Sequence, residues 1–397
     1  MNYTSGGDVL WPVPPDWADG VRETLEWKTD VLRARNARQQ KRELRRAPRR
    51  FFAFRTLAEK QNRRVTDMLL QDRGIASWRL PIWHDVQLIA ALSNGVNVIP
   101  CKTTGYEFAV AGQAVLWKSI NEWEVVTINS ITSTQLGIAG TTSRAWPLGT
   151  RLYPTRTAVL AGQPDEAGWT DASGTRQVQF RITEPCDVTG VLPGATYRGL
   201  PVLEARPHWG EDIGSVFSRD IDTIDPGTGV VYEQDFPGRA YRAADMRWIC
   251  GTRAEHTSKR ALLYALRGQM QSVWLPTWYA DLVLTADIGA SDTTITVEWA
   301  GYTLFGRMQP NWRDIRIELL SGTIYYRRVT AASESGTNEV LTLDAALGAA
   351  VPLAQVRVIS FMVLSEQASD VVEIQHDTDA EGVSTIATRF RGLRNDI

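Results

Sequence analysis

The sequence predicts a mainly β protein of the α+β class, built from two duplicated small β-barrel or sandwich modules that each carry one helix. Two observations lead to this prediction. Short runs alternate polar and apolar residues between Gly, Ser and Asn, which is typical of antiparallel strands. In addition, two segments repeat the same residues in the same order. The length of 397 residues suits two or three domains.

The repeat is clearest around two Leu-Pro-x-Trp motifs. Both motifs, at 80–83 and 275–278, are followed by Asp, then Val or Leu, then a further Leu. Upstream, Thr56-Leu57-Ala58-Glu59 corresponds to Thr252-Arg253-Ala254-Glu255. We therefore expect repeat module 1 over residues 50–161 and repeat module 2 over residues 246–365. Four residues are expected to anchor the modules: Pro81, Trp83, Pro276 and Trp278.

Each module is expected to begin with an aromatic-bearing strand, at 51–54 and 246–249, followed by a helix, at 57–72 and 253–267. Apolar residues recur at helical spacing in both helices, and Gly74 or Gly268 follows as a C-terminal stop. The alternating runs after each helix predict strands at 114–117, 124–128, 151–153, 294–297, 315–319 and 340–343.

The segments outside the modules differ in charge. Residues 1–49 are expected to form an extended arm and a basic helix over 21–46, and residues 366–397 a docking tail. The basic stretch could be a solvated helix face, a contact with an acidic protein or a contact with nucleic acid. If it is an interface, its arginines and those of the tail are the candidates: Arg38, Arg42, Arg45, Arg46, Arg49, Arg50, Arg391 and Arg394.

The net charge of −2 conceals opposite charges along the chain. Residues 1–64 carry 15 cations and eight acids, whereas the bridging segment, expected to be acidic and β-rich over 162–245, has 13 acids and five arginines within 162–237. Such a layout suits head-to-tail packing of identical subunits. The 15 tryptophans, and 37 arginines against six lysines, suggest burial among partners, although a GC-rich genome also replaces Lys by Arg.

No catalytic or metal-binding motif is recognisable, so we expect no enzyme activity, no cofactor and no metal site. None of the four histidines has a metal-ligand spacing, and His84, which corresponds to Tyr279, is expected to be structural. Asp220, Asp222 and Asp225 miss the spacing of a calcium loop and instead indicate an edge strand. The three distant cysteines are expected to be reduced. The absence of a long apolar run predicts that there is no membrane anchor.

Two sets of residues resemble a known family. They are the opening Pro15-Asp16-Trp17 with the run 23–34, and the order helix, Arg-Gly, Leu-Pro-x-Trp, Asp at 73–88 and 267–284. Both resemble minor tail or baseplate proteins of siphophages, which are long-tailed bacteriophages, of the type that infects Pseudomonas-like hosts. The similar segments contain no catalytic residue. The resemblance implies a structural virion protein of the tail tip, a hub or distal tail protein, which is present in the host cytoplasm during assembly.

The resemblance also implies partners. A chain with two copies of a ring-forming module can trimerise and present six modules, joining a six-fold tube to a three-fold hub or spike. We therefore expect a pseudo-six-fold homotrimer, with a hexamer as the competing assembly, in contact with tube, tape-measure, hub or spike and fibre proteins. Contact with DNA in the lumen would be nonspecific. The alternative function is carbohydrate binding on the host surface, with Trp299, Tyr302 and Trp312 stacking on sugars.

Overall fold

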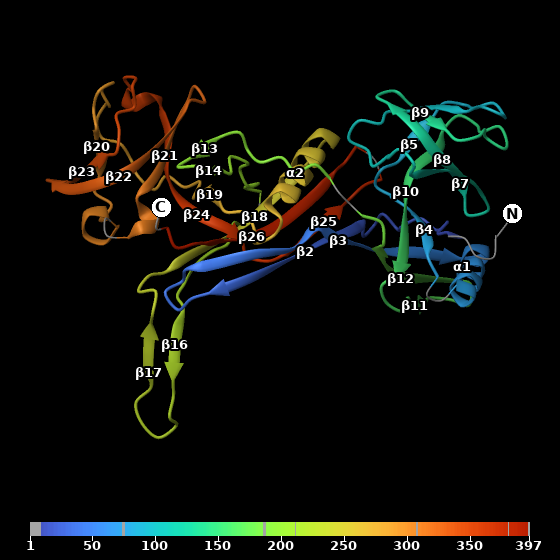
Figure 1. Cartoon of the computed structure of the whole chain (residues 1–397), viewed down its shortest axis with the longest axis horizontal. Coiled ribbons are helices and arrows are strands. Elements are labelled where there is room, and N and C mark those ends of the chain that lie inside the picture. The colour runs from blue at the N-terminus through green and yellow to red at the C-terminus, as the bar shows by residue number, and fades with distance from the viewer. Residues whose placement is uncertain are drawn as a thin grey trace.

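The computed structural model describes residues 9–73, 76–185, 188–210, 212–306, 309–379 and 381–395. The expected mainly β class is confirmed, because large antiparallel sheets dominate the molecule. Figure 1 shows two β-rich lobes at opposite ends of an elongated body, connected by a central sheet. The expected barrels are not found, since no sheet within the described ranges closes on itself.

The central sheet contains eight strands drawn from both halves of the chain, and every neighbouring pair is antiparallel. In spatial order its strands are β15 (Ser215–Ser218), β18 (Tyr241–Cys250), β26 (Ser384–Gly392), β25 (Val371–His376), β2 (Val21–Arg33), β3 (Gln39–Glu59), β12 (Ser173–Ile182) and β11 (Asp165–Gly168). The first four strands come from the C-terminal half of the chain and the last four from the N-terminal half. The β25–β2 pairing therefore joins the two halves.

The first lobe is a second sheet that continues from the central sheet through the β10–β12 pairing. Its strands, in order of pairing, are β4 (Trp78–Pro81), β10 (Thr150–Leu160), β7 (Gln113–Ser119), β8 (Glu122–Thr132), β9 (Gln135–Ile138) and β6 (Val98–Pro100). Two short strands complete it: β5 (Gln87–Ile89), which pairs with β10, and β1 (Val9–Leu10), which runs parallel to β4.

The second lobe has the same order of pairings, and it continues from the central sheet through β24 and β26. Its strands are β19 (Val273–Pro276), β24 (Val356–Gln367), β21 (Asp314–Leu319), β22 (Ile324–Ser335), β23 (Asn338–Leu343) and β20 (Thr294–Glu298). Three short helical turns lie in this lobe, η1 (Tyr302–Gly306), η2 (Pro310–Trp312) and η3 (Leu353–Gln355). Two hairpins precede it in the chain, β13–β14 (Thr196–Tyr197 and Leu200–Pro201) and β16–β17 (Ile221–Ile224 and Tyr232–Asp235).

Both expected helices are confirmed as α1 (Lys60–Arg73) and α2 (Arg253–Leu266). The hydroxyl of Thr252 caps α2 by accepting a hydrogen bond from the amide of Glu255 at 3.3 Å. The helix ends at Arg267 and Gly268, which have φ angles of 53° and 63°. Glycine is well suited to this left-handed position, because a Cβ there would meet the backbone of Asp370.

The expected basic helix over 21–46 is wrong, because this segment forms the long hairpin of β2 and β3. Along β2, the buried residues Val21, Glu23, Leu25 and Trp27 alternate with more exposed neighbours. That period of two places one face of the strand against the core. By contrast, few apolar residues of this segment recur at helical spacing. Ladders with β25 and β12 on either side of the hairpin then fix the strand conformation.

The segment boundaries expected from sequence do not coincide with the ends of sheets. The boundary at residue 365 falls inside β24, and the tail over 366–397 supplies β25 and β26 near the middle of the central sheet. The bridging segment over 162–245 supplies β11 and β12. The edge strand expected around Asp222 is confirmed as β16, which pairs on one side with β17.

The four expected anchors occupy unequal environments. Trp83 is buried against Trp117 and Tyr153, and Pro81 and Pro276 end β4 and β19. Trp278 is only half-buried, has a φ of 65° and lies against the guanidinium groups of Arg206 and Arg316. The fully buried tryptophan of the second half is instead Trp274, whose indole donates to the carbonyl of Tyr197 at 2.9 Å.

Replacing Trp274 by alanine is expected to destabilise the protein more than replacing Trp278. Trp274→Ala leaves a cavity in the core and should cost about 3–5 kcal/mol, whereas Trp278→Ala should cost about 1 kcal/mol. Urea unfolding of the two variants, followed by tryptophan fluorescence and circular dichroism, measures the difference. Equal losses of unfolding free energy would contradict this assignment of the core.

Candidate functional site

A group of buried charged residues lies where the two halves of the chain meet. Glu23 on β2 and Arg50 on β3 belong to the central sheet, Glu107 lies in the loop before β7, and Arg260 is on α2. The side chains of Glu23 and Arg50 are 0% and 1% exposed. Charges this deeply buried are tolerated only when they are paired.

Arg50 is the centre of this group. Its Nε donates to Glu23 at 2.5 Å, and its two terminal nitrogens donate to the two carboxylate oxygens of Glu107. Arg260 also pairs with both carboxylates, and its Nη2 lies 3.4 Å from Glu23. Two arginines therefore share two carboxylates, and α2 of the second half is held to the sheet and loop of the first.

The arginines keep both carboxylates ionised. Burial alone would raise the pKa of Glu23, but Arg50 and Arg260 hold the pKa well below its ordinary value. The pKa of Glu107 is likewise lowered, because Arg260 and Arg50 outweigh the effect of burial. A third pair extends the group, since Arg253 of α2 binds Asp85 and stacks over the ring of Tyr106 at 3.9 Å. These ion pairs provide charge complementarity across the junction of the two halves.

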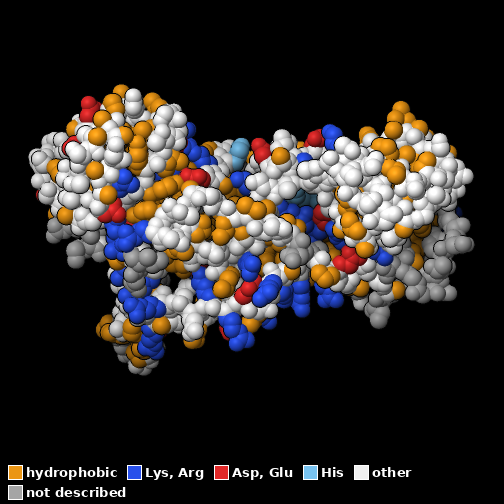
Figure 2. Space-filling model, turned by 45° about the horizontal axis from the view of Figure 1, so that its top comes forward, with side chains coloured by type: hydrophobic (Ala, Val, Ile, Leu, Met, Phe, Trp, Pro, Cys, Tyr) orange, Lys and Arg blue, Asp and Glu red, His pale blue; other side chains and the backbone are white. Residues whose placement is uncertain are grey.

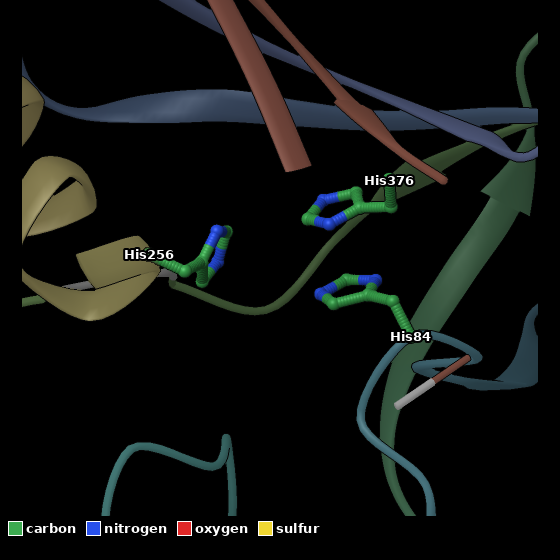
Figure 3. A group of neighbouring side chains, drawn as sticks. All are labelled: His84, His256 and His376. Carbon is green, nitrogen blue, oxygen red and sulfur yellow. The ribbon is translucent and has the colours of Figure 1, made fainter. Parts of the chain in front are cut away.

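Three of the four histidines converge beside these charges. His84 follows β4, His256 lies on α2 and His376 ends β25, and each is at most 2% exposed. The rings of His84 and His376 stack with their centres 3.6 Å apart, and the ring of His256 lies 5.2 Å from that of His376 (Figure 3). The first half supplies one histidine and the second half supplies two.

His84 and His256 are chemically suited to remain neutral rather than to carry charge. Burial lowers the pKa of His256 to about 3, and burial also lowers the pKa of His84 well below its ordinary value. Sequence reasoning missed the cluster and treated His84 as structural. No local spacing could have indicated it, because the three positions are separated by more than a hundred residues each and meet only through the fold.

The two outer strands of the central sheet form a second candidate site. All four residues of β11 and all four of β15 are exposed. The amide of Trp169 donates a hydrogen bond to the carbonyl of Ser173 on β12. Since hydrogen-bonded and non-hydrogen-bonded pairs alternate along an antiparallel ladder, the backbone N–H and C=O groups of Glu166 and Gly168 point away from β12. Likewise, the amide of Asp245 donates to Gly214, so the backbone groups of Ser215 and Phe217 face away from β18. Each end of the sheet thus offers outward donors and acceptors.

The arginines expected at an interface divide into two groups. Arg38, Arg42, Arg46 and Arg49 are exposed on the β2–β3 hairpin. Four more make contacts within the chain that are defined by geometry: Arg45 with Glu26, Arg50 with Glu23 and Glu107, Arg391 with Glu366 and Arg394 with the carbonyl of Asn36. Figure 2 shows Lys and Arg side chains along one long side of the molecule and on the part that projects from it.

The expected sugar-stacking residues do not form one exposed platform. The ring of Tyr302 is buried and stacked on Phe361, and Trp312 meets the same Phe361 edge-on at 4.9 Å. Only Trp299 is largely exposed, and its indole donates to Glu334 at 3.3 Å. Two of these three aromatic residues therefore serve the core of the second lobe.

Removing Arg50 is expected to destabilise the junction strongly. Arg50→Ala leaves two buried carboxylates without this partner and should lower the free energy of unfolding by about 3–5 kcal/mol. The neighbouring, exposed Arg49 is the matched control, and Arg49→Ala should change stability by no more than about 0.5 kcal/mol. Chemical denaturation at pH 7 gives both values, and similar values would show that the buried pairs do not hold the halves together.

Comparisons with known proteins leave the function to be inferred from this geometry. No protein-family model matches the chain, and a search of curated proteins finds no significant match. Among the described residues, neither α1 nor α2 nor any shorter helical turn is long and apolar enough to cross a membrane.

Proposed function

We propose that this protein is a structural component of a bacteriophage tail tip or baseplate, in which copies of the chain form a ring around a central lumen. The observation that carries this proposal is the eight-stranded central sheet, which ends in two exposed strands, β11 and β15. Each half of the chain contributes four neighbouring strands to this sheet. Within one chain, the strand β25 of the second half pairs with the strand β2 of the first half. A neighbouring chain can repeat that contact.

We further propose that the two halves descend from one duplicated module. In each half, four strands of the central sheet have the same order, β2–β3–β12–β11 and β15–β18–β26–β25. A helix follows the second strand of each, and the lobe strands pair in the same order. One further contact occurs in both halves. In the first half, Val9 of β1 pairs in parallel with Trp78 of β4, and in the second half, Val202 pairs in parallel with Trp274 of β19.

This correspondence predicts how two chains meet. The internal join uses the fourth strand of the second half and the first strand of the first half. The strands left over are β11, the fourth strand of the first half, and β15, the first strand of the second half. Pairing β11 of one chain with β15 of the next would repeat the internal join and produce a head-to-tail contact, which closes into a ring if the rotation permits. Three chains would then present six modules.

The arm formed by β16 and β17 supports assembly with further proteins. It projects from the body of the molecule as an isolated hairpin (Figure 1). Its apolar residues face solvent, with Ile221 47%, Ile224 60%, Val230 92% and Tyr232 57% exposed. Exposed apolar residues on a projecting hairpin are typical of a segment that packs on a neighbouring molecule. Tube, hub or spike, tape-measure and fibre proteins are the proposed partners in the virion, and the basic β2–β3 hairpin could contact lumenal DNA nonspecifically.

Blocking the outward edge of β15 is expected to prevent assembly without unfolding the chain. Ser215→Pro removes a backbone N–H that faces away from β18, so it removes a donor needed by the next chain but no bond of the internal ladder. Ser215→Ala keeps that N–H and is the matched control. Analytical ultracentrifugation of the purified proteins should show oligomers for the wild type and Ser215→Ala, and monomers for Ser215→Pro.

Circular dichroism and thermal unfolding establish that Ser215→Pro remains folded. Oligomers of unchanged size in a folded Ser215→Pro protein would contradict the proposed pairing of β11 with β15. A wild-type protein that stays monomeric at every concentration, with measurable glycan binding, would favour the carbohydrate-binding alternative instead.

A further inference from the structure

We propose that His84, His256 and His376 form a binding site for one divalent transition-metal ion, zinc being the best match, which links the two halves of the chain. Each of the three histidines comes from a different element: the turn after β4, helix α2 and the end of strand β25. One ring nitrogen from each lies within 4.8 Å of the others. This proposal is independent of the role in a phage tail.

In two of the rings, the hydrogen bonds occupy one nitrogen and leave the other available. His376 uses Nε2 to contact Glu23 at 2.9 Å, and its Nδ1 is buried without a hydrogen-bond partner among the described residues. His256 uses Nδ1 to contact Ser384 at 2.9 Å, and its Nε2 is buried without such a partner in the same ranges. Histidine ligands in metal sites are held in this way, with the second nitrogen bound to a carboxylate or another polar group.

His84 is the ring that can adjust. Both of its ring nitrogens are buried without a hydrogen-bond partner within the described residues, so no hydrogen bond fixes its orientation. Its stack on His376 cannot be kept unchanged, because a metal lies in the plane of each imidazole that binds it. Zinc–nitrogen bonds of about 2.0–2.1 Å require the three nitrogens, which lie within 4.8 Å of one another, to approach to roughly 3.3 Å. Rotation of the His84 ring, with a small approach of the other two rings, would supply this change.

The surroundings favour three nitrogen ligands rather than a mixed site. Three carboxylates lie close to the histidines, and all are already engaged: Glu23 by Arg50 and His376, Glu107 by Arg50 and Arg260, and Asp85 by Arg253. Three imidazole nitrogens suit zinc and neighbouring transition metals, whereas magnesium and calcium require oxygen ligands. A cleft of about 720 Å³, lined in part by Asp85, Glu107 and His256, provides an entry path and room for a water as fourth ligand.

The test uses the full-length chain without a histidine tag, stripped with chelator and then dialysed against zinc sulfate. Inductively coupled plasma mass spectrometry should find one zinc per chain, and zinc should raise the midpoint of thermal unfolding. His84→Asn is the test variant, because its ring makes no hydrogen bond that the fold requires. His208→Asn is the matched control, since His208 is the fourth histidine and is exposed.

His84→Asn should lose stoichiometric zinc and the thermal shift, while His208→Asn should keep both. Cobalt replaces zinc as a spectroscopic probe, and the wild type should show the visible absorption of a four-coordinate site with three nitrogen ligands and one water. The proposal is overturned if the stripped wild type takes up no stoichiometric zinc, or if a folded His84→Asn binds zinc like the wild type. If His84→Asn does not fold, the cobalt spectrum of the wild type decides, and octahedral bands would reject the site.

Discussion

Residues 21–26 of β2 and 371–376 of β25 form the ladder that makes one sheet out of two halves of the chain. Strands from opposite ends of the sequence must meet for this ladder to form, so its formation requires a long loop closure. Glu23, a residue of this ladder, also belongs to the buried ion pairs that Glu23 and Glu107 form with Arg50 and Arg260. Because an unpaired charge there would be costly, an arrangement of the halves that separates these pairs would be destabilised.

The join has consequences for the ends of the sheet. A sheet that continues from one half to the other inside the chain leaves one exposed strand at each end, and an exposed strand presents unpaired backbone groups. Natural proteins usually cover or shorten such strands. Here both are short, at four residues each, and both belong to the acidic bridging segment, where β15 directly precedes the projecting hairpin of β16 and β17. Pairing with a second copy would satisfy the outward backbone groups of β11 and β15, as the internal join satisfies those of β25 and β2.

Much of the secondary structure could be predicted from local patterns. The strands around Thr294, Ile315 and Leu341 and both helices follow from period-two alternation and from helical spacing with a capping glycine. The hairpin of β2 and β3 could not be predicted as readily. Its many arginines and sparse apolar stripe resemble a solvated helix, and only the ladders with β25 and β12 decide in favour of strands.

The candidate sites were less accessible to sequence reasoning. Arg50 was expected at an interface between molecules, but it stands one position from the exposed Arg49 and is buried between two carboxylates. Successive residues of a strand point to opposite faces of the sheet, and this alone places Arg49 and Arg50 in different environments. The rule could be applied only after the segment was known to be a strand. The histidine cluster depends on contacts between distant elements, so neither spacing nor composition could indicate it.

Native mass spectrometry of the purified wild-type protein tests the central claim most directly, because it counts the chains in one assembly. The proposed ring of six modules predicts a complex of three chains. A complex of six chains would contradict the doubled-module ring, and a monomer at all concentrations would contradict ring formation itself.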